Sequence, residues 1–345
     1  MFRWLTDRLL RLRTWLAVRL GLWRGQWRPG RVSVAGVLGL FGPFSVHTWR
    51  YSLYAPPGLR DDEAAPLVVV LHGCRQRALG FAFAAGLTRL ADRARLRLLC
   101  PQQRRFANPY RCWNWFLPQA QRGDGEVRVI RAMLDDVAAR VPLQAGAVAA
   151  IGLSAGGGLA ALLAFHLPDR FRAVAVIAAP PLLGGHNRQD PRDVMKRGLL
   201  LPPVTALEVR LRACAPLAII QGGEDEVVHP SCAEQLQAQA IASLKRENIE
   251  VEPAEVPAAA ATVTDFRSGS TLRLRRIGLP GLGHEWSGGP GGHPYCSAGG
   301  APLAELCLQF LRDAGALDGR AFPGDDEVGS VEATPGGEEA ARPWR

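Results

Sequence analysis

The residue with the clearest chemical signature is Ser154, in the segment 152–156, which reads Gly-Leu-Ser-Ala-Gly. This is the pattern G-x-S-x-G, and it follows an apolar run and precedes a small-residue helical segment, which is the context that a nucleophilic serine requires. On such a sharp turn the glycines avoid Cβ clashes, and the N-terminus of the helix favours developing negative charge. The alternative is a glycine-rich turn that carries an incidental serine. We interpret Ser154 as a nucleophile.

A serine hydroxyl needs a base to take its proton, and that base is a histidine oriented by a carboxylate. In this arrangement the carboxylate and then the histidine follow the serine along the chain. His284 fits this order, because it lies in a glycine-flanked loop after an expected strand at 271–279. His293, in the same glycine-rich loop, is the second candidate.

The acid that orients the base is expected in a loop after a buried strand. Asp225 follows the apolar run 217–221 in the sequence Gln-Gly-Gly-Glu-Asp-Glu. Glu224 and Glu226 are local rivals, and a solvated acidic loop is the non-catalytic alternative. We predict that Asp225 is the orienting acid, because its place in the chain is where this fold puts that residue.

An oxyanion hole needs two backbone N–H groups, and one of them belongs to the residue after the serine. Ala155 supplies that group. The second is expected from the loop after an early strand, where residues 71–76 read LHGCRQ. We predict the backbone N–H of Cys74 as this donor. We expect His72, in the same loop, to be structural rather than catalytic.

The elements that position these residues follow from hydrophobic patterning. Short apolar runs alternate along the chain with helical patterns, which predicts an α/β fold: a mostly parallel sheet with helices on both faces. Two late runs joined by Arg-Ser-Gly-Ser predict a β-hairpin. The expected strands are 67–71, 96–100, 147–151, 173–177 and 217–221, the hairpin is 262–266 with 271–279, and the expected helices are 82–95, 126–141, 157–166 and 231–249.

The composition is that of a globular protein. The 345 residues are 48% hydrophobic and 21% charged, which excludes a disordered or fibrous chain. The net charge of +9 is uneven, because the first 31 residues carry eight arginines and the last 24 carry six acids. Leucine and tryptophan recur in the basic segment at helical spacing, which predicts a helix that lies on an interface or on the domain's own surface. We therefore expect a basic amphipathic arm (1–31), a catalytic domain (45–315) and a disordered acidic tail (322–345).

Signals for location are weak. Arginines interrupt the N-terminal segment, so it lacks the apolar run of a secretory signal. The longest uncharged stretch, 141–168, contains five glycines, which favours a strand, a turn and a buried helix over a membrane span. We expect a cytoplasmic protein that associates with a granule or membrane surface through residues 1–28, with export as the alternative. No arginine stripe with interleaved aromatics occurs in the body, so nucleic acid is not an expected partner.

Several blocks of the chain together resemble one family. The sequence over residues 45–312 is similar to α/β-hydrolase esterases of the poly(3-hydroxybutyrate) depolymerase type, which are related to feruloyl and acetyl-xylan esterases. The resemblance implies the α/β-hydrolase fold, Ser154, Asp225 and His284 as the triad, and ester hydrolysis without a metal or organic cofactor. The matching blocks are LHGCRQ at 71–76, CWNWF at 112–116, GLSAGGGLA at 152–160, GGEDEVV at 222–228 and GLGHEWSGG at 281–289.

The sequence departs from the family in two places. The acid loop opens with Gln221 where His is common, and an Asp-x-x-Arg element is missing around 141–149. These departures leave the expected ester chemistry intact. The expected substrate is a short-chain poly(3-hydroxyalkanoate) or its oligomers, the alternative is a feruloyl or acetyl-xylan ester, and the alternative of another class is an idle protein that binds a granule or membrane surface.

The tryptophans and cysteines of the matching blocks allow two readings each. Flat aromatic faces suit a substrate groove, so Trp113, Trp115 and Trp286 are candidate substrate-binding residues, with core packing as the alternative. The seven cysteines form no CxxC pair, which gives no support for a zinc ribbon or a thioredoxin-type site. The resemblance suggests a disulfide between Cys74 and Cys112, whereas a cytosolic protein would keep both reduced.

Overall fold

A single ten-stranded sheet forms the centre of the protein in the computed structural model, which describes residues 25–36, 46–184, 189–200 and 212–317 with Leu12, Leu16 and Pro202. The strand order is β1-β2-β4-β3-β5-β6-β7-β10-β9-β8. The six central strands are parallel, and two antiparallel strands flank them on each side. In spatial order the bounds are β1 (Gln26–Ala35), β2 (Val46–Ala55), β4 (Arg97–Gln102), β3 (Ala65–Leu71), β5 (Leu143–Leu153), β6 (Ala173–Ile177), β7 (Leu217–Gly222), β10 (Thr271–Leu279), β9 (Thr262–Ser268) and β8 (Glu252–Val256).

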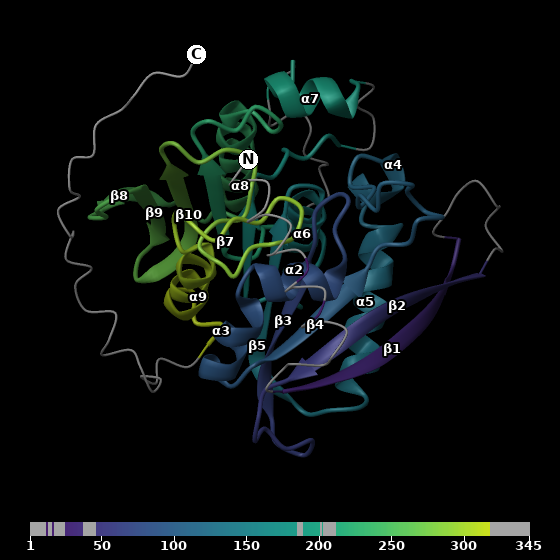
Figure 1. The fold of residues 1–345 in the computed structure, drawn as a ribbon. Helices are drawn as coiled ribbons and strands as arrows, with labels where there is room; N and C mark the ends of the chain where they lie inside the picture. Colours follow the sequence, from purple (N-terminus) through teal and green to yellow (C-terminus); the bar gives the residue numbers. More distant parts are fainter. Residues whose placement is uncertain are drawn as a thin grey trace, which may run out of the picture.

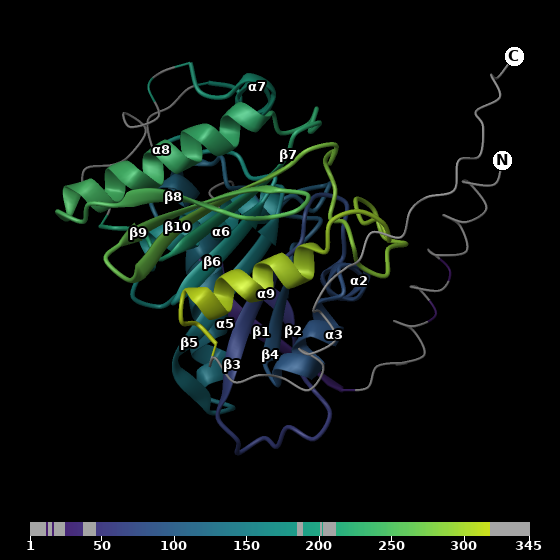
Figure 2. The same ribbon diagram turned by 90° about the vertical axis from the view of Figure 1, so that its left-hand side faces the viewer.

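Helices cover both faces of the sheet (Figures 1 and 2). One layer of core contains side chains of α5 (Glu126–Ala138), α6 (Ala155–His166) and α8 (Pro230–Arg246). The opposite layer contains side chains of α2 (Ala78–Ala84), α3 (Leu87–Ala94) and α9 (Leu303–Asp313). The predicted α/β architecture, with a mostly parallel sheet between helices, is therefore confirmed. Two short helices, α4 (Pro118–Gln121) and α7 (Pro191–Arg197), lie in connections.

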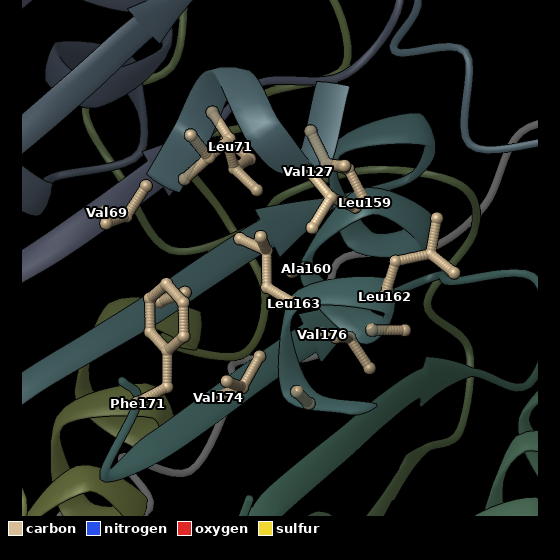
Figure 3. Packing of buried hydrophobic residues seen from close by; sticks show 14 of the residues in the cluster. Val69, Leu71, Val127, Leu159, Ala160, Leu162, Leu163, Phe171, Val174 and Val176 are labelled. Carbon is tan, nitrogen blue, oxygen red and sulfur yellow. The ribbon is translucent and has the colours of Figure 1, made fainter. Parts of the chain in front are cut away.

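Helix α6, which directly follows Ser154, is almost entirely buried. All of its residues except His166 are buried, because alanine, glycine, leucine and phenylalanine occupy every side of it. A helix that is apolar all round has to lie inside the protein. Figure 3 shows Leu159 and Leu163 of this helix in one packed cluster with Val127 of α5 and Val174 and Val176 of β6. The turn that opens α6 is thus held by the core.

The first two strands were not expected from the sequence. β1 pairs with β2 along its whole length. The end of the basic arm, which was expected at residue 31, therefore falls inside a strand and is wrong. β1 carries exposed arginines and Pro29, so its sequence lacks the apolar run by which the central strands were predicted. The other edge strand, β8, exposes Glu252, Pro253 and Glu255 in the same manner. Apart from Leu12 and Leu16, the arm before residue 25 lies outside the described residues, as does the tail from 318 onward.

The remaining differences concern element ends. The helix expected at 82–95 is two helices, α2 and α3, which are separated at Gly86 with φ +74°. The expected strand at 147–151 is longer, because β5 runs from Leu143 to Leu153. Among the described helices, none has both the length and the apolar character needed to cross a bilayer.

A buried carboxyl fixes the long connection between β4 and α5. Glu126, at the start of α5, is 3% exposed and accepts hydrogen bonds from the backbone N–H and side-chain amide of Asn114, at 2.6 and 2.9 Å. It also accepts one from the side-chain amide of Gln103, at 2.5 Å. That amide donates in addition to the Cys112 carbonyl, at 3.0 Å. Burial raises the pKa of Glu126 to about 7, although the three donors oppose this shift.

This raised pKa predicts a pH dependence of stability. Between its ordinary pKa near 4.5 and the folded value of about 7, the native state holds a proton that the unfolded chain has lost. The free energy of unfolding therefore falls as pH rises through this window, by about 3 kcal/mol for this group alone. Glu126→Gln should remove that slope, while adding a constant destabilisation because its NH₂ faces other donors. Urea unfolding at about pH 5 and pH 8 measures both effects.

The matched control is Glu250→Gln, which changes an exposed carboxyl and should keep the slope of the unmodified protein. An unchanged slope in Glu126→Gln would contradict the assignment.

Candidate catalytic site

Ser154 stands at the turn between β5 and α6, as its motif predicts. Its backbone is strained, with φ 56° and ψ −120°, and its N–H donates to the Ile177 carbonyl at 2.8 Å. The flanking glycines are required by close approach. A Cβ at Gly152 would lie 2.2 Å from the Gly156 carbonyl oxygen, and one at Gly156 would lie 2.2 Å from the Leu71 carbonyl oxygen. The turn therefore presses directly on the end of β3.

Three side chains from separate loops meet at this turn. Ser154 follows β5, Asp225 follows β7 and His284 follows β10, and these parallel strands bring their carboxyl ends to one edge of the sheet. His284 Nε2 lies 3.0 Å from the Ser154 hydroxyl oxygen, and its Nδ1 lies 2.8 Å from Asp225 Oδ2. A proton on Nδ1 satisfies the carboxylate, which leaves the Nε2 lone pair facing the hydroxyl. The structure brings together the three residues that the sequence selected.

Asp225 is held as an anion. It is 2% exposed and accepts hydrogen bonds from the backbone N–H groups of Val227 and Val228, at 2.9 and 2.8 Å. Burial alone would raise its pKa, but the hydrogen bond and charge of His284 together with the two backbone donors hold the pKa below its usual value. The Gln221 side-chain amide donates to Asp225 Oδ2 at 3.2 Å and to the Val228 carbonyl at 2.9 Å. This residue, where the family commonly has His, therefore braces the acid loop.

The rival residues lie elsewhere. Glu224 and Glu226 are exposed beside Asp225 and do not take its place against His284. His293 packs on α2, where a Cβ at Gly80 would come within 2.4 Å of its ring. The Arg77 N–H donates to the Nε2 atom of His293 at 3.4 Å. The second candidate base is thus turned toward α2.

The loop after β3 lies against the serine. A Cβ built on Gly73 would be 3.5 Å from the Ser154 Cβ atom. The N–H of Gly73 donates to Gln76 Oε1 and that of Arg75 donates to the Tyr110 carbonyl, both at 2.6 Å. Cys74 lies between these two anchored residues. Its N–H and that of Ala155, at the first turn of α6, remain the predicted oxyanion donors.

The loop is also tied from outside. Cys74 forms a disulfide with Cys112, with Cα atoms 4.2 Å apart, so of the two readings the structure has the bridged one. His72 is fully buried, and its Nε2 accepts from the Gln103 N–H at 3.2 Å while its Nδ1 lies 2.8 Å from the Gly73 carbonyl oxygen. Burial lowers the pKa of His72 to about 4, so it stays neutral at pH 7. This histidine has the structural place expected for it.

The three tryptophans require a correction. Trp113, Trp115 and Trp286 are 0%, 3% and 0% exposed, so they offer almost no surface to a substrate and are core residues. Trp286 meets Phe81 edge to face at 5.4 Å, and Trp115 packs where a Cβ on Gly158 would come within 2.8 Å of it. Burial of these large apolar rings removes their surface from water and so stabilises the fold.

Three apolar side chains are exposed on the loops around the site, and none of them was among the residues predicted from the sequence. Tyr110, Val227 and Tyr295 are 60%, 45% and 39% exposed. The Tyr110 carbonyl accepts from the Arg75 N–H in the loop after β3. The Val227 N–H donates to Asp225, and the Tyr295 ring lies 5.7 Å from that of His284. No spacing signal marks them, since they lie in irregular loops. We call these three residues the apolar rim.

Comparison with known proteins agrees with this architecture. Poly(3-hydroxyalkanoate) depolymerase C of Paucimonas lemoignei is 38% identical over 129 residues, which are 37% of this chain and only 30% of that protein. A protein of Nocardia uniformis subsp. tsuyamanensis named "Putative esterase NocK" is 30% identical over 255 residues, covering 70% and 72% of the two chains. The structure of an acetyl xylan esterase from Aspergillus awamori superposes with a TM-score of 0.57 at 16% identity, covering 74% of this chain and 94% of that one, and it has the same α/β-hydrolase fold. Residues 49–250 match the family described as "Esterase PHB depolymerase", and the chain therefore belongs to that family.

Proposed function

We propose that this protein hydrolyses carboxylic esters through an acyl-enzyme on Ser154. The observation that carries the proposal is the continuous hydrogen-bonded relay from Asp225 through His284 to the serine hydroxyl, at 2.8 and 3.0 Å. Such a relay activates a hydroxyl that is otherwise a weak nucleophile. Membership of an esterase family supports the same chemistry.

The mechanism follows from the geometry. His284 Nε2 takes the hydroxyl proton while Ser154 Oγ bonds to the ester carbonyl carbon, and the carbonyl electron pair moves onto oxygen. The N–H groups of Cys74 and Ala155 stabilise that oxyanion. The intermediate then expels the alcohol, which receives the proton from His284, and water cleaves the acyl-enzyme by the same route. Asp225 keeps the imidazole oriented and stabilises its cationic form throughout.

Substitution of the relay tests this mechanism. Ser154→Ala should lower kcat on p-nitrophenyl butyrate by at least about 10⁴-fold, because no nucleophile remains. Asp225→Asn should lower it by about as much, since the amide favours the wrong histidine tautomer. Ser270→Ala, in the exposed turn between β9 and β10, is the matched control and should retain full activity. Retention of a tenth of the activity by Ser154→Ala would rule the mechanism out.

For the substrate, we propose a short-chain poly(3-hydroxyalkanoate) or its oligomers. The apolar rim supports this choice, because exposed tyrosine and valine side chains beside a nucleophile suit the aliphatic surface of a polyester. The name of the Paucimonas lemoignei relative points to the same polymer class. Feruloyl and acetyl-xylan esters are the competing substrates within the same chemistry.

If the apolar rim contacts the polymer, its substitution should lower the hydrolysis of polymeric substrate more than that of a soluble ester. Tyr110→Ser and Val227→Ser should lower hydrolysis of poly(3-hydroxybutyrate) particles by about 5-fold or more, because each removes apolar contact area. Turnover of soluble p-nitrophenyl butyrate, the internal control, should change less than about 2-fold, since neither side chain is part of the relay. Equal losses on both substrates would contradict a polymer-docking role. Faster release from feruloylated or acetylated xylan than from polyester would overturn the substrate assignment.

We also propose that the basic N-terminal arm brings the enzyme to a polymer granule or an anionic membrane. The pattern of arginines opposite leucines and tryptophans in the first 24 residues is typical of helices that lie at such surfaces. The segment to remove ends at residue 24 rather than 28, because β1 begins at Gln26.

Removal of residues 1–24 should reduce the fraction that sediments with polyester granules or anionic vesicles by about 5-fold or more, and more strongly at low salt. Activity on soluble p-nitrophenyl butyrate should persist, because the site lies entirely within the described domain. Unchanged partitioning would defeat the proposal for the arm. Partitioning without any ester hydrolysis by the full chain would instead favour the idle surface-binding protein.

A further inference from the structure

Gln76 is a wholly buried polar residue that the mechanism above does not use. It ends the LHGCRQ segment, two residues after Cys74, and its exposed fraction is 0%. A buried carboxamide is costly unless both of its ends are hydrogen-bonded. Both ends of this one are, and they bind two different functional loops.

One end of Gln76 holds the oxyanion loop. Its Oε1 accepts a hydrogen bond from the Gly73 N–H at 2.6 Å. Gly73 directly precedes Cys74 and lies against Ser154, as its Cβ position 3.5 Å from the serine Cβ atom shows. The Gln76 acceptor therefore sets the peptide next to the predicted oxyanion donor.

The other end holds the histidine loop, 218 residues away in the sequence. Gln76 Nε2 donates to the Pro294 carbonyl at 2.5 Å. The residue after Pro294 is Tyr295, whose carbonyl accepts from the Trp286 N–H at 2.8 Å and whose ring meets the ring of His284 edge to face. The segment that Gln76 holds thus contacts the His284 ring and also fixes the backbone two residues after His284.

We propose that Gln76 is a positioning residue that sets the oxyanion donor of Cys74 and the base His284 in register with each other. This inference rests on the proposed esterase function and deepens it. Acyl transfer needs the base on one side of the reacting carbon and the oxyanion donors on another, both within hydrogen-bond reach. One rigid carboxamide that bonds to both loops fixes that separation. The carboxamide offers an acceptor and a donor at once without carrying charge, which suits it to bridge the two loops.

The first test removes both bonds. Gln76→Leu leaves the Gly73 N–H and the Pro294 carbonyl unpaired, so both loops should shift. We expect kcat on p-nitrophenyl butyrate to fall by about 10- to 100-fold with KM changed less than about 3-fold, because the loss falls on the transition state. The rate is expressed per folded molecule, as measured by circular dichroism. A kcat within about 2-fold of the unmodified enzyme would overturn the proposal.

The second test uses pH. In Gln76→Glu the ionised carboxylate still accepts from the Gly73 N–H but repels the Pro294 carbonyl, whereas the protonated acid restores both bonds. The ratio of variant to unmodified kcat should therefore rise by about 5-fold or more as pH falls from about 8 to about 6. The other titratable groups around this position, His284, Glu285, His293 and Cys296, are the same in both proteins, so the ratio reports the substituted residue. A residue that only filled space would give a ratio independent of pH.

The matched control is Gln239, which is also 0% exposed and bonds both the N–H and the carbonyl of Leu182, at 2.9 and 2.8 Å. Gln239→Glu places the same charge in a similar buried setting, at a residue that bonds to Leu182 rather than to Gly73 or Pro294. Its kcat ratio should stay flat with pH, and a slope equal to that of Gln76→Glu would overturn the proposal. An unmodified enzyme without esterase activity would instead refute the proposed function, so the two failures are distinguishable.

Discussion

The arrangement of the catalytic edge depends on the contact between the turn at Ser154 and the end of β3. At Gly152 and Gly156 the backbones approach so closely that a Cβ would overlap a carbonyl oxygen. Ser154 and the start of the loop after β3 are therefore fixed relative to each other by backbone contact. The apolar helix α6, which is buried against one face of the sheet, holds this contact inside the core. A strained serine backbone persists only where its surroundings determine it so strongly.

Buried polar groups fix the positions of the loops around the site. Hydrophobic contacts have no direction, whereas hydrogen bonds to Glu126, Gln103, Gln76 and Gln221 fix loops at defined positions. Glu126 holds the segment that carries Cys112, and the disulfide passes that restraint on to Cys74. Most of these groups are amides, which satisfy a donor and an acceptor without charge. The loops around the site are thus positioned mainly by neutral amides, and the Asp225 carboxylate is the group that contacts His284.

The sequence revealed those parts of the site that depend on local patterns. Ser154, Asp225 and His284 could be predicted because each lies at a fixed place after a buried strand, and the central strands are continuous apolar runs. The tryptophans could not be assigned, because an aromatic ring suits a groove and a core equally until its burial is known. β1 was missed because this edge strand carries arginines and Pro29. β2 is an inner strand, and the alternation of its buried Trp49, Tyr51 and Leu53 with polar residues is a strand signal that was overlooked. The bond from Gln76 to Pro294 joins residues too far apart in the chain for any spacing to indicate it.

The polar residues of the two edge strands, β1 and β8, affect whether two copies of this protein can pair through their sheets. An unpaired strand offers a row of free amides and carbonyls to any passing chain. Here Pro29 lacks one amide hydrogen and the arginines of β1 repel a like-charged twin, while Glu252, Pro253 and Glu255 do the same on β8. Each edge of the ten-stranded sheet therefore resists pairing with the same edge of another copy. Copies crowded together at high concentration should therefore not join β1 to β1 or β8 to β8.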